Sequence, residues 1–171
     1  MLSFEIRELA RRAVDVDGLL ESDDPVWQAG DEKPSEPLHA TGRLSVAGAS
    51  RYYWSGHIDG LAHTPCRRCL ADSTVRVREE VHVFFVEAGD EIGDDPDTYR
   101  LPPRAQEVDL RPAIREQWLL AAPAFVLCRE DCKGLCPRCG ADLNAGPCTC
   151  ASEVDPRWAV LREPRGGSVE R

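Results

Sequence analysis

Six of the eight cysteines of this chain fall in one short stretch, from Cys128 to Cys150. The other two, Cys66 and Cys69, form a separate C-x-x-C pair. Eight thiols in two groups match the ligand count of two tetrahedral zinc sites, because Zn²⁺ takes four soft ligands at tetrahedral corners. A fold that serves both sites has to bring cysteines together that are far apart in the sequence.

The second half of the stretch has the residues for a metal-binding turn. Two cysteines in Cys136-Pro-Arg-Cys139 reach one ion only if the chain between them turns tightly, and Pro137 pre-sets the backbone angle for that turn. Gly140 takes a positive φ directly after the second cysteine at no steric cost. The C-x-C segment that ends at Cys150 supplies the second half of a site, and this spacing predicts zinc.

The partition of ligands that needs the fewest assumptions is four plus four. One ion is then held by Cys66, Cys69, Cys128 and Cys132, and the other by Cys136, Cys139, Cys148 and Cys150. The spacing also allows Cys132 and Cys136 to exchange places. His63 is the one histidine close enough to a cysteine pair to replace a thiol. A thiol redox role for the Cys66/Cys69 pair is a further alternative.

We expect a cytoplasmic protein with reduced cysteines. The first residues, Met-Leu-Ser-Phe-Glu-Ile-Arg-Glu, do not form a secretory signal, which has a charged segment followed by an apolar one. Disulfides persist in oxidising compartments, so the cysteines of such a chain are expected to bind metal. No run of residues is long and apolar enough to cross a bilayer, and no membrane partner is expected.

The residue pattern predicts an α+β fold, with a mostly antiparallel sheet packed by one main helix. Three segments read as the strands of a meander: 38–46, 52–61 and 74–86, the last with clear alternation of apolar and polar residues. The range 107–122 is the best helix, with Asp109 as its N-cap and Pro112 in its first turn. An apolar stripe at helical spacing faces the sheet and consists of Leu110, Ile114, Trp118 and Ala121.

We expect two parts of unequal size. Residues 1–123 form the α+β core, with acidic loops at about 21–37 and 87–106, and residues 124–171 form a cysteine-rich zinc lobe with a tail. The tail carries Trp158, Val160 and Leu161, which are candidates for docking on the body.

Net charge and motifs exclude several functional classes. The formal net charge is −9 and the pI about 4.9, which argues against DNA binding and against coating of a phosphate backbone by bulk charge. The sequence has no P-loop, dinucleotide fingerprint or nucleophile elbow, and all-cysteine metal sites are normally closed. We therefore expect a protein that is not an enzyme and that binds zinc for structural reasons.

Several motifs together resemble the YceD family, the large ribosomal RNA subunit accumulation proteins. They are Pro65-Cys-Arg-Arg-Cys-Leu70, Val108-Asp-Leu-Arg-Pro-Ala-Ile-Arg-Glu116, Leu119-Leu-Ala-Ala-Pro123, Cys128-x₃-Cys-Lys-Gly-Leu-Cys-Pro-Arg-Cys-Gly-Ala-Asp-Leu-Asn144, Cys148-x-Cys150 and Asp155-Pro-Arg-Trp158. The Cys-Lys-Gly-Leu-Cys-Pro-x-Cys-Gly block is the specific one. The resemblance extends from the first strands to about Leu161.

The resemblance implies a bacterial, cytoplasmic factor needed for accumulation of 23S ribosomal RNA, without a known catalytic activity. Its partner would be the precursor of the large ribosomal subunit, either the 23S RNA or its proteins. Arg67 and Arg68 lie between two expected ligands and are candidates for contact with RNA or with a partner protein. Alternatives are a zinc-ribbon interaction module without a ribosomal role, and the C-x-x-C redox protein.

Overall fold

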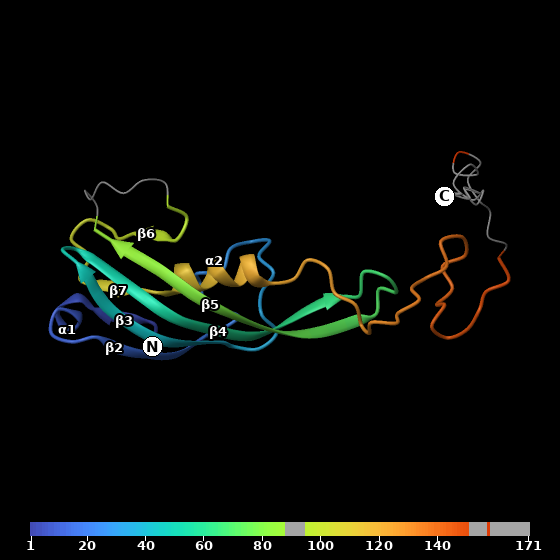
Figure 1. Cartoon of the computed structure of the whole chain (residues 1–171), viewed down its shortest axis with the longest axis horizontal. Helices are drawn as coiled ribbons and strands as arrows, with labels where there is room; N and C mark the ends of the chain where they lie inside the picture. The colour runs from blue at the N-terminus through green and yellow to red at the C-terminus, as the bar shows by residue number, and fades with distance from the viewer. Residues whose placement is uncertain (88–94, 151–156, 158–171) are drawn as a thin grey trace, which may run out of the picture.

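The computed structural model describes residues 1–87, 95–150 and 157. Its main feature is a five-stranded sheet in the order β2-β3-β4-β5-β6 (Figure 1). These strands are β2 (Val14–Leu20), β3 (Leu38–Gly48), β4 (Arg51–Pro65), β5 (Asp72–Val86) and β6 (Thr98–Arg100). The first four strands are antiparallel neighbours, whereas β6 runs parallel to β5. The predicted α+β fold with a mostly antiparallel sheet is confirmed.

The hairpin of β4 and β5 is the longest element. Each strand has 15 residues, which corresponds to about 50 Å of extended chain. The two strands pair in continuous register from Arg51/Val86 to Pro65/Asp72. Figure 1 shows that one half of the hairpin lies in the body, while the other half projects from it toward the C-terminal segment.

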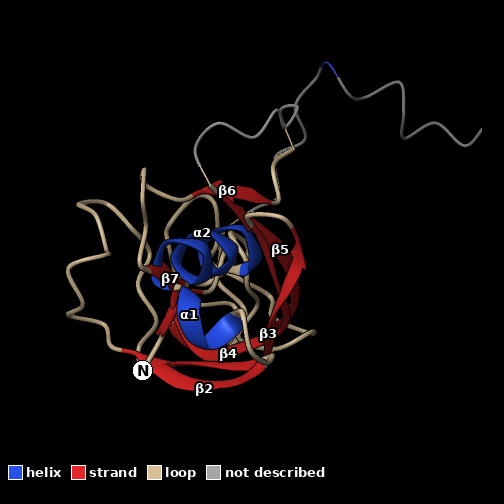
Figure 2. Cartoon of the chain, turned by 90° about the vertical axis from the view of Figure 1, so that its left-hand side faces the viewer, coloured by secondary structure: helices blue, strands red, loops and turns tan. Residues whose placement is uncertain are grey.

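Helix α2 (Arg111–Ala121) packs against the concave face of this sheet (Figure 2). Ile114 and Trp118 of α2 are fully buried, as are Trp54 and Ile58 on β4. Gly60 allows the close approach, because a Cβ at this position would lie 3.0 Å from the Trp118 ring. The predicted apolar stripe is therefore the face that packs on the sheet, and this burial is the main stabilising contribution of the helix.

A second, two-stranded sheet closes one end of the body. Strand β1 (Ser3–Glu5) pairs with β7 (Glu107–Asp109), and α1 (Ile6–Leu9) follows β1. The predicted helix over 107–122 consequently begins later, at Arg111. The N-cap is Leu110, so the prediction of Asp109 at this position is wrong by one residue. The Oδ1 of Asp109 still accepts a hydrogen bond from the backbone N–H of Arg111, the first residue of the helix, at 3.0 Å.

Strands β2 and β6 lie in segments for which the sequence analysis predicted no strand. β2 alternates strictly between buried and exposed residues, a signal that the sequence does contain. β6 lies inside the range predicted as an acidic loop, and is held by pairing with the end of β5. The loop 21–37 is anchored by Trp27, which is buried and donates a hydrogen bond from its Nε1 to the carbonyl of Glu21 at 2.8 Å.

The residues Trp158, Val160 and Leu161 of the tail lie outside the described part of the chain. Among the described residues, the structure has no helix long and apolar enough to cross a membrane.

Candidate metal centres

The structure brings the eight cysteines together in two groups of four. In each group the four Sγ atoms all lie within 4.8 Å of one another. The proximal group consists of Cys66, Cys69, Cys128 and Cys132, and the distal group of Cys136, Cys139, Cys148 and Cys150. This grouping is the four-plus-four partition favoured by the sequence spacing, and Cys132 and Cys136 do not exchange places.

The proximal group joins two distant parts of the chain. Cys66 and Cys69 lie at the tip of the β4–β5 hairpin, and Cys128 and Cys132 lie in the segment that follows α2. A backbone bridge between Cys66 and Val126 aligns the two segments, and the Arg67 N–H donates to the Val126 carbonyl at 2.9 Å. The hairpin tip is therefore fixed to the C-terminal lobe (residues 124–150 of the described chain) at this group.

The sulfur positions fit zinc. A tetrahedron with Zn–S bonds of about 2.3 Å separates its sulfur atoms by about 3.8 Å. The Sγ atoms of Cys66 and Cys132 are 3.8 Å apart, and those of Cys69 and Cys128 are 3.6 Å apart. Four soft thiolates at these distances match the preference of Zn²⁺, so the residues present can hold the ion.

Both groups begin with the same backbone turn. In the proximal group, the N–H of Cys66 donates to the carbonyl of Ala71, and the N–H of Leu70 donates back to the carbonyl of Cys66. Cys136, Gly140 and Ala141 make the equivalent pair of bonds in the distal group. The residue after the second cysteine has a positive φ in both turns, 61° at Leu70 and 71° at Gly140. The turn predicted around Gly140 is thus present twice.

Backbone N–H groups from both segments of the proximal group favour the ionised form of its first thiol, that of Cys66. Hydrogen bonds from backbone N–H groups, first that of Cys128 and then that of Cys69, lower the pKa of Cys66 to about 6. Hydrogen bonding to the thiol of Cys69 has the opposite effect on Cys128 and raises its pKa to about 12. One sulfur of the group is thus readily ionised while its neighbour keeps its proton until a metal ion displaces it.

The distal group has the same asymmetry. Backbone N–H groups, first that of Cys139 and then that of Arg138, lower the pKa of Cys136 to about 6. Hydrogen bonding to Cys139 raises the pKa of Cys150 to about 12. Zinc binding to either group would therefore release protons, and the affinity would fall as the pH falls.

Asn144 connects the two groups, a role that the sequence analysis did not assign. It lies in the loop between Cys139 and Cys148, yet its Nδ2 lies 3.6 Å from the Sγ of Cys132 in the proximal group. Its Oδ1 accepts from the backbone N–H of Lys133 at 2.8 Å. A polar side chain held between two cysteine clusters is typical of a residue that orients metal ligands from outside the coordination shell.

The two arginines of the hairpin tip differ in their contacts. Both are exposed. The Nη1 of Arg68 donates to the backbone carbonyl of Cys132 at 2.8 Å, and the carbonyl of Arg68 accepts from the N–H of Leu135 at 3.0 Å. Arg68 therefore helps to hold the lobe on the hairpin through its side chain, whereas Arg67 contacts the lobe through its backbone N–H, which donates to the Val126 carbonyl.

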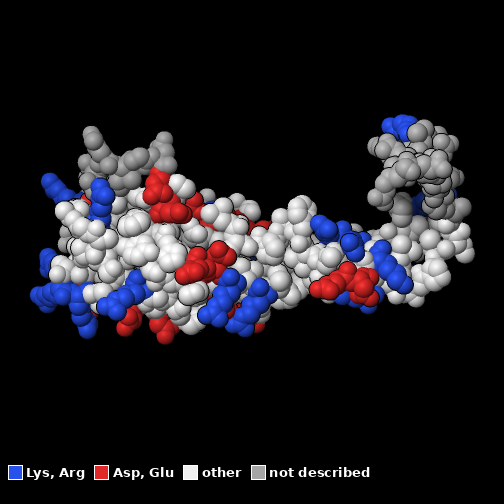
Figure 3. Space-filling model, in the orientation of Figure 1, with Lys and Arg blue, Asp and Glu red and all other residues white. Residues whose placement is uncertain are grey.

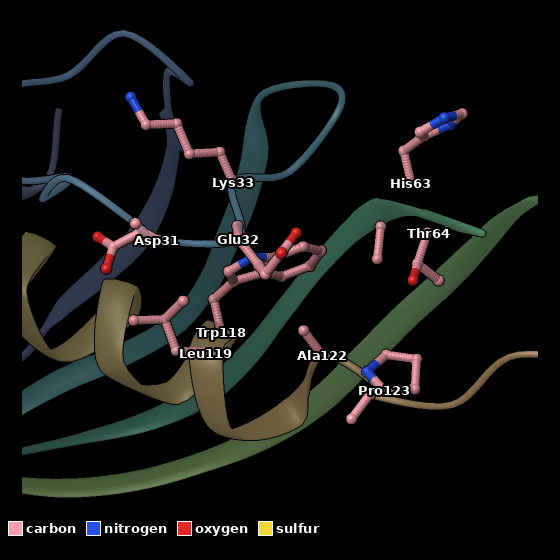
Figure 4. A pocket seen from close by; sticks show the side chains of 12 residues that line it. Asp31, Glu32, Lys33, His63, Thr64, Trp118, Leu119, Ala122 and Pro123 are labelled. Atoms are coloured by element: carbon pink, nitrogen blue, oxygen red, sulfur yellow. The ribbon is translucent and has the colours of Figure 1, made fainter. Parts of the chain in front are cut away.

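His63 is not a member of either group. Its Nε2 lies 3.7 Å from a carboxylate oxygen of Asp72, and its side chain is 54% exposed. It lines a groove of about 480 Å³ between α2 and the loop 21–37, where Figure 4 shows it across from Lys33 and Asp31. At the groove wall, Trp118 Nε1 donates to the Glu32 carbonyl at 2.7 Å.

The comparisons with known proteins agree with this geometry. The sequence profile of the family "Large ribosomal RNA subunit accumulation protein YceD" matches residues 54–163, a range that contains both cysteine groups and all of the hairpin except the first three residues of β4. The chain belongs to this family.

Several relatives are similar to part of this chain. An uncharacterised protein of Mycobacterium tuberculosis is 35% identical over 104 residues, which cover 59% of this chain and 49% of the relative. The "Large ribosomal RNA subunit accumulation protein YCED homolog 1, chloroplastic" of Arabidopsis thaliana is 37% identical over 60 residues, 35% of this chain and 19% of the relative. The chain thus spans about half the length of the Mycobacterium tuberculosis relative, and less of the plant ones. No solved structure matches.

Proposed function

We propose that this protein is a non-enzymatic factor in the biogenesis of the large ribosomal subunit, which supports the synthesis, processing or stability of 23S ribosomal RNA. The family match over residues 54–163 carries this proposal. The plant relatives are named for large ribosomal RNA subunit accumulation. The partner would be the subunit precursor in the bacterial cytoplasm, with no DNA and no membrane involved.

In this proposal zinc has an architectural role in both groups. A site with four cysteine ligands has no open coordination position for a substrate or an activated water, in contrast to catalytic zinc sites with three protein ligands. Zinc in the proximal group would fix the hairpin tip to the lobe. The distal group would fold the loop that carries Asn144. We therefore propose no catalytic activity for the chain.

The exposed tip of the hairpin is the proposed contact to the precursor. Arg67 and Arg68 lie beside the proximal group, and an arginine guanidinium can pair with phosphate or with a carboxylate. Because Arg68 also donates to the carbonyl of Cys132, its replacement would affect the lobe as well. Replacement of Arg67 therefore tests the contact to the precursor more specifically than replacement of Arg68.

The test is deletion of the gene in its own host, with the ratio of 23S to 16S ribosomal RNA as the readout. We expect the deletion to lower this ratio and to lower the amount of mature large subunits in a sucrose gradient. The wild-type gene should restore both, and Arg67→Glu should restore them less well than Arg7→Glu, a matched change at the other end of the body. A normal ratio in the deletion strain would contradict the proposal.

The zinc-ribbon alternative, a protein-interaction module without a ribosomal role, predicts a different salt dependence of binding. A complex with RNA weakens steeply as salt rises, whereas an apolar protein interface is much less sensitive. Co-sedimentation of the purified chain with large-subunit precursors at increasing salt, combined with the deletion phenotype, therefore distinguishes the two.

A further inference from the structure

The convex face of the sheet carries three neighbouring aromatic rings, here named the aromatic platform: Tyr53, His82 and Phe84. The ring centroid of Tyr53 lies 4.8 Å from that of Phe84 and 6.2 Å from that of His82. The Tyr53 Oη and the His82 Nδ1 are 2.8 Å apart, within hydrogen-bonding distance. The rings therefore form one connected surface held in place by the sheet.

The platform faces away from the core. Its members alternate along β4 and β5 with buried core residues such as Trp54, Val83 and Phe85. Neither Tyr53 nor Phe84 belongs to the core cluster, and Phe84 is 37% exposed. Since successive side chains of a strand point to opposite faces, the platform lies on the side of the sheet that α2 does not cover (Figure 2).

Arginines flank the platform on both sides. In the strand register, Arg43 pairs with Ser55, which pairs with His82. On the other side Thr98 pairs with Phe84, and Arg100 is two residues further along β6. Strand spacing and residue rise place both arginines within about 10 Å of the rings. Arg43 and Arg100 are exposed.

A basic groove adjoins the platform. It has a volume of about 540 Å³ and lies between the α1–β2 turn and the β3–β4 turn. Arg11 and Arg12 line it together with Ser45, the register partner of Tyr53. Figure 3 shows Lys and Arg side chains gathered at this end of the molecule, beside an uncharged area of the sheet.

Acidic groups are also present in this region. The Oε1 of Glu80 lies 3.1 Å from the Nε2 of His82, Asp15 is the register partner of Arg43, and Arg12 is paired with Glu8 at 2.8 Å. Bulk attraction of a polyanion is therefore weak here. A ligand that binds here must therefore obtain binding free energy from stacking on the rings as well as from charge.

We propose that the aromatic platform binds single-stranded RNA, with bases stacked on Tyr53 and Phe84 and phosphates paired with Arg43 and Arg100. Unpaired RNA bases are recognised by stacking on aromatic side chains, and exposed aromatic residues on a sheet flanked by arginines supply that chemistry. A duplex hides its base faces and cannot use the platform. The inference rests on the proposed function for its choice of RNA. It adds a second contact, on the body of the protein, to the one proposed at the hairpin tip.

The test is binding of the zinc-loaded full chain to a fluorescein-labelled single-stranded RNA of about 12 nucleotides, measured by anisotropy. We expect Phe84→Ala and Tyr53→Ala each to weaken binding about tenfold. Arg43→Glu and Arg100→Glu should weaken it as well and should lower the salt dependence of the affinity, since each removes a phosphate contact. A duplex of the same sequence should bind more weakly than the single strand.

The controls lie on the same convex face, about 20 Å further along the strands. Leu19 and Arg78 belong to one row of the register, with His39 and Asp59 between them. Leu19→Ala removes an apolar side chain that is 55% exposed, and Arg78→Glu makes the same charge change as the platform variants. Both should bind as wild type, and all variants are compared by thermal unfolding. Because Phe84 is half-exposed, its truncation is expected to leave the fold intact.

Two results would overturn the inference: absence of binding to the single strand by the wild-type chain, or platform variants that bind like the controls. The proposed function fails separately, if the deletion strain has a normal ratio of 23S to 16S RNA. A deletion phenotype that is fully restored by Phe84→Ala and by Arg43→Glu would leave the function standing and reject the platform as its RNA contact.

Discussion

Leu70 and Gly140 occupy the same position in two equivalent turns, and only one of them is suited to it. Both have a positive φ, and a side chain with a Cβ in this region costs about 1 kcal/mol. We expect Gly140→Ala to destabilise the lobe by about that amount, and Leu70→Gly to be neutral or stabilising. Thermal unfolding of the zinc-loaded protein measures both. Equal destabilisation by the two changes would contradict the account of the turns.

Asn144 provides a second test at this scale. Asn144→Ala removes the donor to the Cys132 sulfur and the acceptor of the Lys133 N–H, a change we expect to cost about 1–2 kcal/mol. The change should weaken zinc in the proximal group, although Asn144 lies in the distal loop. Competition with a chromophoric chelator measures the zinc affinity. Asn144→Asp is the matched control, because it keeps the acceptor and loses the donor.

At the scale of elements, an ion pair ties the loop 21–37 to α2. Arg115 donates from Nε and Nη2 to the carboxylate of Asp31 at 2.6 and 2.8 Å, and the Asp31 side chain is only 9% exposed. We expect Arg115→Ala to lower the midpoint of thermal unfolding by several degrees. Arg104→Ala, at an exposed position of the body, is a control that should change it little.

The same pair predicts a pH dependence. The hydrogen bond from Arg115 lowers the pKa of Asp31 below its ordinary value of 3.8. A carboxyl with a lowered pKa stabilises the folded state above its unfolded pKa, and this contribution is lost as the pH falls through the folded value. Unfolding measured between neutral pH and pH 3 should therefore show a steeper loss of stability for the wild type than for Arg115→Ala.

Most elements with a local signal were predicted from the sequence, and those defined by distant partners were not. Strand β2 is the exception, since it was missed although its alternation is local. The alternation in 74–86 and the apolar stripe of α2 are local, and both elements were found. β6 forms only because Thr98–Arg100 pairs with the end of β5. The acidic residues around it do not indicate this pairing. The helix start was misplaced for the same reason, since Glu107–Asp109 pairs with β1 at the opposite end of the chain.

Within the candidate site, spacing favoured the observed grouping of thiols, because cysteines that are two to four residues apart can reach the same ion. It left open whether Cys132 and Cys136 exchange places. The role of Asn144 could not be derived from spacing, since it depends on how one loop lies on the other group. The turn at Leu70 could have been predicted from the sequence, because the segment Cys66-x-x-Cys69-Leu-Ala aligns with Cys136-x-x-Cys139-Gly-Ala. The aromatic platform could be recognised only from the strand register of the structure, because Tyr53 and Phe84 lie far apart in the sequence.

At the scale of the whole molecule, we expect the body to fold without the attached lobe. Every residue of the core cluster precedes Pro123, so we expect a chain that ends at residue 123 to fold its body. The outer half of the β4–β5 hairpin should become sensitive to proteases near Cys66, because its ligands from the lobe are gone. Limited proteolysis with mass spectrometry locates the cuts. An unfolded truncated chain would contradict the division at 123.

The central claim is that eight thiols hold two zinc ions in the two groups seen here. Its most direct test is the metal content of the full chain purified without oxygen, by elemental analysis, with titration of free thiols on the same sample. The account predicts two zinc ions per chain and no reactive thiol until a chelator is added. One zinc ion with four reactive thiols would contradict the claim of two zinc sites. The hairpin tip would then not be fixed to the lobe by a metal ion, and the redox alternative for Cys66 and Cys69 would again apply.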